Sequence, residues 1–514
     1  MLVHIYSAKC IGIEAVKVTV EVDIAMGIGI HLCGLGDVAV KESLLRTITA
    51  LQTLGYHIPG KKIVINLAPA DMHKSGSGYD LPIAVGIIAA SAQKYMPLIS
   101  DTLIMGELGL DGSVRHIKGG LAYADFAQKN GFKRCILPQT SALEAKCMDG
   151  IDVYGVTTLS DVVSILENTQ ADNILKVNTS NNGNKSLAHF EPEVDFAEII
   201  GQEGAKRAME IAAAGGHNVI MIGAPGSGKS SLAKALAGIL PQMSKEEAFE
   251  CSKIYSIAGM GHLSQGLMQS RPFRSPHYSA SIAAIIGGGG NGENIIPGEV
   301  TLSHLGVLFI DEFNLMPKSV IEALRAPMED RKVTISRLRG KVEYPSSFTL
   351  VAAANPCPCG YYGEGDKCTC TPGQRQQYFS RLSGPIMDRM DLQVWIHPLP
   401  PAALSNRVPA ENSFSIRKRV MEARRIQSER FRGSNIRCNA EMTNRQIEKY
   451  CNLNEDEKRL MQTLMETLSL SMRAYHRIIK VARTIADIDG CPLIENRHLM
   501  EAAGYRILDK TPTN

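Results

Sequence analysis

The sequence predicts an α/β protein in three parts: an α+β N-terminal part, a central α/β part and a helical C-terminal part. The first part alternates apolar and polar residues at 16–23, which is typical of a strand with one buried face. The central part has the order strand, glycine-rich loop, helix and strand within 217–310, which indicates a parallel sheet. The last part repeats its apolar residues about every 3.6 positions at 417–432 and 475–489, which predicts helices.

Length and composition narrow the class of protein. The 514 residues are enough for about three domains, and 44% hydrophobic with 21% charged residues is an ordinary globular composition. The net charge of +3 means that any surface for nucleic acid must be local. No apolar run reaches the roughly 18 residues of a membrane span, and the first residues do not resemble a secretion signal. We therefore expect a cytoplasmic protein with no membrane partner.

The N-terminal part alternates strands and helices. The expected elements are strands at 16–23, 63–67 and 135–137 and helices at 41–54 and 80–92. This pattern ends near Glu167 and is followed by a polar stretch rich in Asn, Ser and Gly, which is typical of a flexible linker. The predicted divisions are a first domain at 1–167, the linker at 168–193, the central core at 194–402 and the helical domain at 403–514.

A glycine-rich loop with one lysine lies between a predicted strand and a predicted helix. Residues 223–230 fit the pattern G-x-x-x-x-G-K-[ST] in full. Such a loop directs backbone N–H groups and the positive end of a helix toward one point, which favours phosphate. We expect Lys229 to neutralise the phosphates of ATP and Ser230 to bind Mg²⁺. The expected phosphate-binding residues are Gly223, Ala224, Pro225, Gly226, Ser227, Gly228, Lys229, Ser230 and Ser231.

Two later strands end in polar residues suited to ATP hydrolysis. Four apolar residues at 307–310 predict a buried parallel strand, and Asp311 and Glu312 follow at its carboxyl end, where ligands bind in such sheets. Asp311 is expected to share Mg²⁺ with Ser230, and Glu312 is expected to activate the attacking water. Asn355 follows the next apolar strand and is expected near the γ-phosphate or the water.

Several longer strings resemble one family. They are RPFRSPHYSA at 271–280, GVLFIDEFN at 306–314, ANPCPCG at 354–360, RLSGPIMDRMD at 381–391, SMRAYHRI at 471–478 and VARTIA at 481–486. With the order of the motifs, they resemble the ComM/YifB family of magnesium-chelatase-like AAA+ ATPases over nearly the whole chain. The resemblance implies a Lon-protease-like (S5-like) N-terminal domain, a P-loop AAA+ core and a C-terminal helical lid. It also implies a hexameric ring that acts as a DNA helicase in branch migration during natural transformation, with recombination proteins as partners.

The resemblance also assigns roles by position. Asn355 matches sensor 1, Arg389 matches the arginine finger, and Arg473 matches the sensor 2 arginine, with Arg477 as the second choice. An arginine finger from a neighbouring subunit stabilises charge on the transferring phosphoryl group, so the ring would be part of the enzyme. A surface salt bridge is the alternative for Arg389. The 81 residues at 230–310 exceed one helix and one strand, and they resemble the helix-2 insertion of this clade.

Basic residues suggest DNA contacts at two places. Two alternating runs within 331–344 flank a short turn, which predicts a hairpin, and the resemblance suggests that this hairpin faces the channel of the ring. Arg337, Arg339 and Lys341 would then contact the phosphate backbone of forked, branched or single-stranded DNA, whereas a solvated hairpin is the alternative. The basic segment 417–437 is interpreted either as a solvated lid helix or as a DNA groove.

Four of the 12 cysteines fall within fourteen residues. They are Cys357, Cys359, Cys368 and Cys370. Four thiolates in one loop suit Zn²⁺, which binds four ligands tetrahedrally, but the C-x-C spacing is tighter than the usual C-x2-C. Structural zinc and free or redox-active thiols therefore remain as alternatives.

Two segments of the N-terminal domain resemble a protease domain. Residues 73–84 and 106–121 resemble the proteolytic domain of Lon, which uses a Ser–Lys pair in which Lys takes the proton of the nucleophilic Ser. Ser77 lies near the nucleophile position, but Ala122 stands where the Lys is expected, and Lys118 precedes the glycine pair. We predict a Lon-like scaffold without peptidase activity.

The motifs leave several functions open. The leading hypothesis is a DNA-translocating AAA+ motor. The alternatives are a magnesium-chelatase-type motor subunit, a Lon-like ATP-dependent protease and an assembly platform that uses ATP only to form rings. The N-terminal domain and the C-x-C pairs argue against the chelatase, and Ala122 argues against the protease. Fold class by itself would not establish helicase activity.

Overall fold

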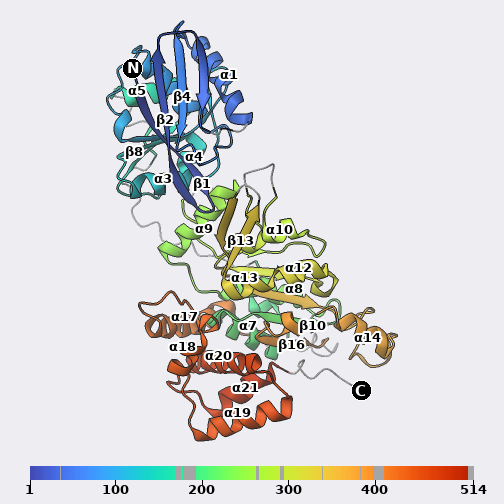
Figure 1. The fold of residues 1–514 in the computed structure, drawn as a ribbon. Coiled ribbons are helices and arrows are strands. Elements are labelled where there is room, and N and C mark those ends of the chain that lie inside the picture. The colour runs from blue at the N-terminus through green and yellow to red at the C-terminus, as the bar shows by residue number, and fades with distance from the viewer. Residues whose placement is uncertain are drawn as a thin grey trace.

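The structure is a computed structural model. It describes residues 1–34, 36, 38–168, 175–177, 193–261, 266–289, 295–337, 340–382, 384–398 and 410–506. Within them the chain forms three regions that follow one another along an elongated molecule, with the N-terminal region at one end and the C-terminal helices at the other (Figure 1). Most of the predicted linker and the predicted boundary at 402 lie outside the described residues. Among the helices that the structure describes, none is both long and apolar enough to cross a bilayer.

The N-terminal region is built on a seven-stranded sheet with the order β3-β4-β2-β1-β5-β8-β9. The strands are β1 (Val3–Ile11), β2 (Glu14–Ala25), β3 (Gly29–Cys33), β4 (Lys62–Ala68), β5 (Thr102–Ile104), β8 (Arg134–Pro138) and β9 (Asp152–Val156), and β6 (Glu107–Leu108) pairs with β7 (Val114–Arg115). The helices are α1 (Val38–Thr53), α2 (Asp80–Ala90), α3 (Gly120–Lys129), α4 (Gln139–Glu144) and α5 (Leu159–Leu166). Every residue of α2 is buried, as expected of a helix that is apolar on all sides.

The central region is a five-stranded parallel sheet with the order β11-β12-β15-β10-β16. The strands are β10 (Val219–Gly223), β11 (Phe273–Arg274), β12 (Val307–Ile310), β15 (Thr349–Ala354) and β16 (Leu392–Ile396). The helices are α7 (Glu203–Gly215), α8 (Lys229–Ile239), α9 (Lys245–Ala258), α10 (Ile282–Ile286), α11 (Glu299–Leu302), α12 (Lys318–Ala323), α13 (Arg325–Asp330), α14 (Pro372–Phe379) and α15 (Gly384–Met387).

Packing on both faces explains why these strands are apolar at successive positions. Val219 and Met221 of β10 belong to the core shared with the C-terminal helices, whereas Ile220 and Ile222 belong to the core on the opposite face. All residues of β10, β12 and β15 are buried. A parallel sheet covered on both faces requires this composition.

The hairpin predicted within 331–344 is present. Strands β13 (Lys332–Arg337) and β14 (Gly340–Pro345) are antiparallel, with Arg337 opposite Gly340. Residues 338 and 339, which include Arg339, lie outside the described residues.

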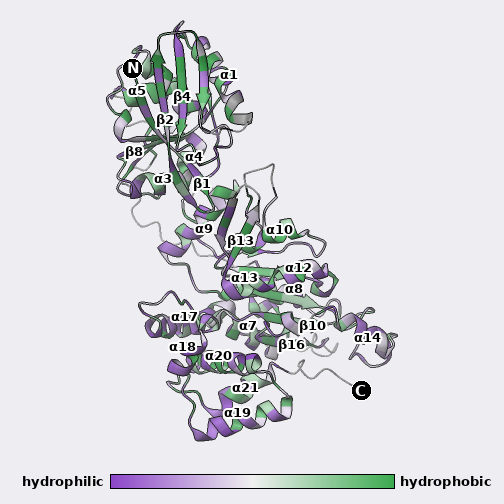
Figure 2. Ribbon diagram, viewed as in Figure 1, coloured by the Kyte–Doolittle hydropathy of each residue, from purple (hydrophilic) through white to green (hydrophobic). Residues whose placement is uncertain are grey.

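The C-terminal region is helical and shares one apolar core with α7 and α8. Its helices are α17 (Ser413–Arg430), α18 (Asn444–Tyr450), α19 (Glu455–Leu468), α20 (Met472–Ile488) and α21 (Asn496–Gly504). In Figure 2 the strands of the N-terminal sheet alternate between hydrophobic and hydrophilic residues, whereas α17 and α19 are largely hydrophilic. These two helices therefore cover a core that is built mainly by other elements.

Several elements of the N-terminal region contact the central region. Helix α3 lies against α9, where Lys253 Nζ is 2.7 Å from a carboxylate oxygen of Asp125 (Figure 1). The turn between β1 and β2 lies against β14, because a Cβ added to Gly12 would be 2.9 Å from the carbonyl oxygen of Glu343. Helix α9 and the hairpin β13–β14 are thus both in contact with the first region.

Candidate nucleotide-binding site

The phosphate-binding loop lies between the end of β10 and the start of α8. Gly226 and Gly228 have φ of +76° and +92°, which are left-handed conformations that favour glycine. A Cβ added to Gly223 would be 2.5 Å from the carbonyl oxygen of Ile396, so the loop needs glycine there for close packing. This backbone places the N-terminus of an eleven-residue helix at the loop, which is the arrangement that binds phosphate.

Lys229 is held inside this loop. Its ammonium donates to the carbonyl oxygens of Gly223 (2.6 Å) and Ala224 (2.8 Å) and to Asn355 Oδ1 (3.3 Å). The residue is 7% exposed, and burial lowers the pKa of Lys229 although Asp311 and Glu312 oppose the shift. The charge therefore lies where desolvation strengthens its attraction for a phosphate.

The structure brings the predicted magnesium ligands together. Ser230 Oγ donates to Asp311 Oδ2 over 2.9 Å, and the other oxygen of Asp311 accepts the backbone N–H of Glu312. Two adjacent ligands of an octahedral Mg²⁺ lie about 3 Å apart, given bonds of about 2.1 Å, so this oxygen pair fits the ion. Glu312 adopts φ of +50°, a conformation rare outside glycine and frequent at functional sites.

Arg389 is not free to leave its own chain in this conformation. Its guanidinium is 6% exposed, lies 2.6 Å from Glu329 Oε1 and donates to the carbonyl oxygen of Pro385. The ion pair that the sequence allowed as an alternative is therefore present, although it is buried on the arginine side. A role in a neighbouring subunit stays a prediction.

The two sensor 2 candidates on α20 have different environments. Arg477 forms an ion pair with Asp391, which is 3% exposed. Burial would raise the pKa of Asp391, but Arg477 and His217 outweigh it and hold that pKa well below its usual range. Arg473 is exposed and has no ion pair with any residue that the structure describes. The guanidinium of Arg477 is thus already bound to a buried carboxylate of its own chain. This supports Arg473, the first choice, as the sensor 2 arginine.

The residues expected to contact DNA are only partly described. Lys341 is exposed on β14 opposite Ser336, next to the hairpin turn. The side chain of Arg337, like Arg339, lies outside the described residues.

Most of the basic segment 417–437 contacts the protein itself. The guanidinium groups engaged in this way are Arg417 on Gly238, Arg419 on Glu210 and Glu411, Arg424 on Ala213, Arg425 on Glu422 and Glu429, Arg430 on Asp487, and Arg437 on Glu250. Six of the eight Lys and Arg residues of this segment therefore have partners within the chain, whereas Lys418 and Arg432 are exposed. Whether the segment is a solvated lid helix or a DNA groove stays a prediction. Arg271 and Arg274 of the insert are likewise bound, to Glu247 and Glu299.

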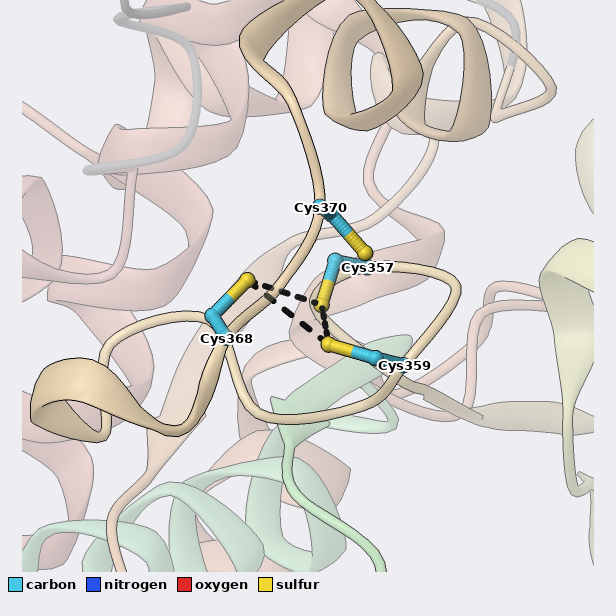
Figure 3. Close-up of side chains that lie close together, drawn as sticks. All are labelled: Cys357, Cys359, Cys368 and Cys370. Carbon is cyan, nitrogen blue, oxygen red and sulfur yellow. Dashed lines mark hydrogen bonds between the residues drawn. The ribbon is translucent and has the colours of Figure 1, made fainter.

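The four cysteines of the predicted cluster lie close together, with their sulfur atoms directed toward one another (Figure 3). The Sγ atom of Cys357 is 3.2 Å from that of Cys359 and 3.7 Å from that of Cys368, and all four sulfurs lie within 4.8 Å of one another. Tetrahedral zinc with bonds of about 2.3 Å separates its sulfurs by about 3.8 Å, so the site fits the ion. Burial and the neighbouring thiols raise the pKa of Cys357 to about 12, whereas the Tyr361 backbone N–H and Cys357 lower the pKa of Cys359 to about 6.

The candidate peptidase residues do not form a Ser–Lys pair. Ser77 donates a hydrogen bond to Glu107, and Ala122 is fully buried in α3. Lys118 lies against Gly259 at the end of α9, so its side chain is used between the two regions.

The sequence interpretation missed two residues beside the site. Asn314 is 1% exposed, and neither atom of its amide has a hydrogen-bond partner among the described residues. Its position directly after Asp311-Glu312-Phe313 was the available signal. Gly360, in the cysteine loop, would place a Cβ 2.7 Å from Pro225 of the phosphate-binding loop, and no sequence pattern indicates this contact.

Comparison with known proteins agrees with this geometry. The family model for magnesium chelatase, subunit ChlI, matches residues 195–404, that for subunit ChlI of Mg-chelatase matches 20–141, and that for the ChlI C-terminal part matches 410–506. The uncharacterized protein YifB of Escherichia coli K12 is 40% identical over 98% of this chain and 97% of its own length. Competence protein ComM of Haemophilus influenzae is 39% identical over 99% and 98%. The magnesium-chelatase 38 kDa subunit of Cereibacter sphaeroides is 27% identical over 31% of this chain and 52% of its own length.

The parallel sheet, the phosphate-binding loop and the acidic strand end define a nucleotide-binding core of the AAA+ type. YifB and ComM match this chain over nearly its whole length, which assigns the chain to one family within the AAA+ class. The chain belongs to the ComM/YifB family of magnesium-chelatase-like AAA+ proteins.

Proposed function

We propose that this protein is a ring-forming AAA+ ATPase that translocates on DNA as a helicase or branch-migration factor. One observation carries the ATPase part: Lys229 bonds to Asn355, and Ser230 bonds to Asp311, at the carboxyl edge of one parallel sheet. The DNA part is supported by the likeness to competence protein ComM over the whole chain and by the exposed Lys341 on the hairpin. Such a protein would work in the cytoplasm, with recombination proteins as partners.

Each residue of the site has a distinct task in hydrolysis. Lys229 would exchange its carbonyl partners for phosphate oxygens, which a preformed positive charge favours. Ser230 and Asp311 would hold Mg²⁺, which neutralises charge on the phosphates. Glu312 would orient or deprotonate the attacking water, and Asn355 would position that water against Lys229.

A ring would complete the site. Arg389 would have to leave Glu329 before it reached the nucleotide of a neighbouring subunit, because its guanidinium is now paired within the chain. Glu329 is about half-exposed, so the pair lies at a surface that a neighbouring subunit is able to reach. Subunit contact and release of this ion pair would then be one event.

The cysteine cluster is proposed to hold a structural Zn²⁺. Four sulfur donors at tetrahedral spacing occupy all positions of a structural zinc site and leave none for a reacting ligand. A motor subunit of the magnesium-chelatase type is the second candidate, since the 38 kDa subunit matches part of the chain. That relative is 27% identical over about a third of the chain, whereas competence protein ComM is 39% identical over 99% of it, so the DNA motor is the better-supported function.

The test is ATP turnover with and without forked or four-way DNA across a series of salt concentrations. We expect branched DNA to stimulate turnover and salt to weaken the stimulation, because phosphate contacts release counterions. Glu312→Gln should reduce turnover at least about 100-fold and leave ATP binding intact, because the carboxylate acts on water. Turnover that ignores every DNA would remove the DNA role and favour another substrate for the motor.

A further inference from the structure

The loop that carries the four cysteines is packed directly on the phosphate-binding loop. Gly360 has φ of +85°, and a Cβ there would lie 2.7 Å from Cδ and 2.9 Å from Cγ of Pro225. Both atoms belong to a rigid ring, so no side chain fits at 360 unless the phosphate-binding loop moves. Pro225 is one of the loop residues that should surround the phosphates.

Two further contacts fix the cysteine loop relative to the same site. At its start, Asn355 accepts a hydrogen bond from Lys229 over 3.3 Å, two residues before Cys357. Farther along, the rings of Tyr362 and Trp395 meet edge to face with centroids 6.5 Å apart. Trp395 belongs to β16 and pairs with Ile222, the residue just before the phosphate-binding loop.

The loop has little else to hold its shape. Between Pro356 and Thr371 its regular structure is the single turn Gly365–Lys367, and most of its side chains are exposed or half-buried. Cys357 and Cys368 bring its two arms together over 3.7 Å. A metal bound by the four thiolates would join the two arms of the loop. The loop would then have less conformational freedom before ATP binds, so ATP binding would cost less conformational entropy.

We infer that Gly360 is a positioning residue through which the four-cysteine loop holds Pro225, and with it the phosphate-binding loop, in the conformation that binds ATP. This inference rests on the proposed ATPase function and assigns the cysteine loop a role in it. The contact that we assign to Gly360 is with Pro225 of the phosphate-binding loop, so the main effect should be on nucleotide affinity. Metal occupancy and ATP binding are consequently coupled, and each strengthens the other.

Gly360→Ala tests the contact in the full-length protein. We expect the Kd for a fluorescent ATP analogue, and the KM for ATP, to rise at least tenfold, with a smaller change in kcat and the zinc content unchanged. Gly365→Ala is the matched control, because Gly365 lies in the same loop with φ of +59° and has no atom within 4 Å of a Cβ placed there. The control also places a Cβ on a left-handed backbone but makes no contact there, so its Kd for the ATP analogue should stay within about twofold of wild type.

A second substitution separates the contact from general damage. Pro225→Ala removes both atoms that the new methyl group at position 360 would meet. Gly360→Ala should therefore weaken ATP binding strongly in the wild type but only slightly in a protein that already carries Pro225→Ala. The double variant should thus bind the ATP analogue almost as tightly as Pro225→Ala does. Equal weakening by Gly360→Ala and Gly365→Ala, or no recovery in the double variant, would overturn the inference. A wild type that binds no ATP would instead refute the proposed function.

Metal removal supplies the remaining comparison. Cys368→Ser should lower the zinc content and raise the Kd for the ATP analogue together, in proportion. A protein that loses its zinc and keeps its ATP affinity would contradict the coupling. If the wild type as purified holds no zinc, the zinc proposal fails, and the Gly360 comparisons decide the positioning role by themselves.

Discussion

At the scale of single residues, the nucleotide site shows how tertiary neighbours change the meaning of a side chain. Lys229 and Arg477 are both basic and partly or fully removed from water, but only Lys229 has carbonyl partners that a phosphate is able to replace. Arg477 is bound to a buried carboxylate, Asp391. A cation with exchangeable partners is suited to binding, whereas a cation paired with a buried anion is part of the structure.

This distinction predicts opposite results for two arginines of α20. Arg477→Ala should lower the free energy of unfolding by about 3–5 kcal/mol, because Asp391 would keep a buried charge without its partner. Arg473→Ala should change it by less than about 0.5 kcal/mol, as for an exposed side chain, and should lower ATP turnover. Urea unfolding and turnover on both variants check the pair. A destabilised Arg473→Ala protein would show that the exposed position has an unrecognised partner.

At the scale of elements, the hairpin β13–β14 and the phosphate-binding loop were both anticipated from local patterns. In the described part of the hairpin, Arg337 is opposite Gly340, so the two strands end on either side of the short turn expected within 331–344. Strand β10 includes Gly223 and helix α8 starts at Lys229, so both elements run into the loop pattern 223–230. Element ends are decided by hydrogen bonds to neighbours, so pattern alone places them only within a few residues.

The hairpin carries a prediction about salt. Replacing Arg337, Arg339 and Lys341 together by Gln should bring turnover with DNA down to the level without DNA. The slope of log affinity against log salt should become shallower by about 2–3, since each lost phosphate contact contributes about 0.7–0.9. Lys458→Gln on α19, an exposed lysine paired only with Glu455, is the control and should leave the slope unchanged. An unchanged slope in the triple variant would place the DNA contacts elsewhere.

At the scale of the whole molecule, the first region is joined to the motor core by a buried polar interface. Lys253 of α9 is 3% exposed and contacts both Asp125 of α3 and Glu14. Ser256 donates to the carboxylate of Glu144, which is 2% exposed. Buried ionic and polar groups are costly when separated, so the two regions should move together during ATP turnover.

Removing one buried cation should loosen this junction. Lys253→Ala leaves the buried Asp125 with the exposed Lys129 as its remaining cation. We expect the free energy that holds the two regions together to fall by about 3 kcal/mol. By the usual 1.4 kcal/mol per tenfold, amide hydrogen exchange in α3 and α9 should then be more than about 100-fold faster. Lys129→Ala removes a partner of the same carboxylate that is mostly in water, so it should cost less than about 1 kcal/mol. Equal exchange in both variants would contradict the coupling.

The junction should also weaken as pH rises. Burial raises the pKa of Glu144 to about 7, from its usual 4.5, although Ser256 and the backbone N–H groups of Leu121 and Gly120 oppose the shift. Between about pH 4.5 and 7, Glu144 keeps its proton while the two regions are in contact, whereas it loses the proton when they separate. The free energy that holds the two regions together therefore falls as pH rises through this window, by at most about 3 kcal/mol. Hydrogen exchange of α3 at pH 5 and pH 8, corrected for intrinsic rates, checks this. Glu144→Gln should abolish the difference, and a persistent one would assign it to another group.

The sequence by itself predicted the chemistry that we propose for this protein: which residues are expected to bind phosphate and magnesium, which four cysteines lie together, and that Ala122 stands where a Lon-like peptidase would need a lysine. These features depend on residue types at short spacing, and short spacing is preserved in any fold that forms the local element. Only the tertiary structure decided that Arg477 and most of the arginines of 417–437 are paired internally, that Arg389 is bound to Glu329, and that Gly360 touches Pro225. These facts depend on residues far apart in the chain, whose meeting is decided by packing, and packing leaves no mark in a local pattern.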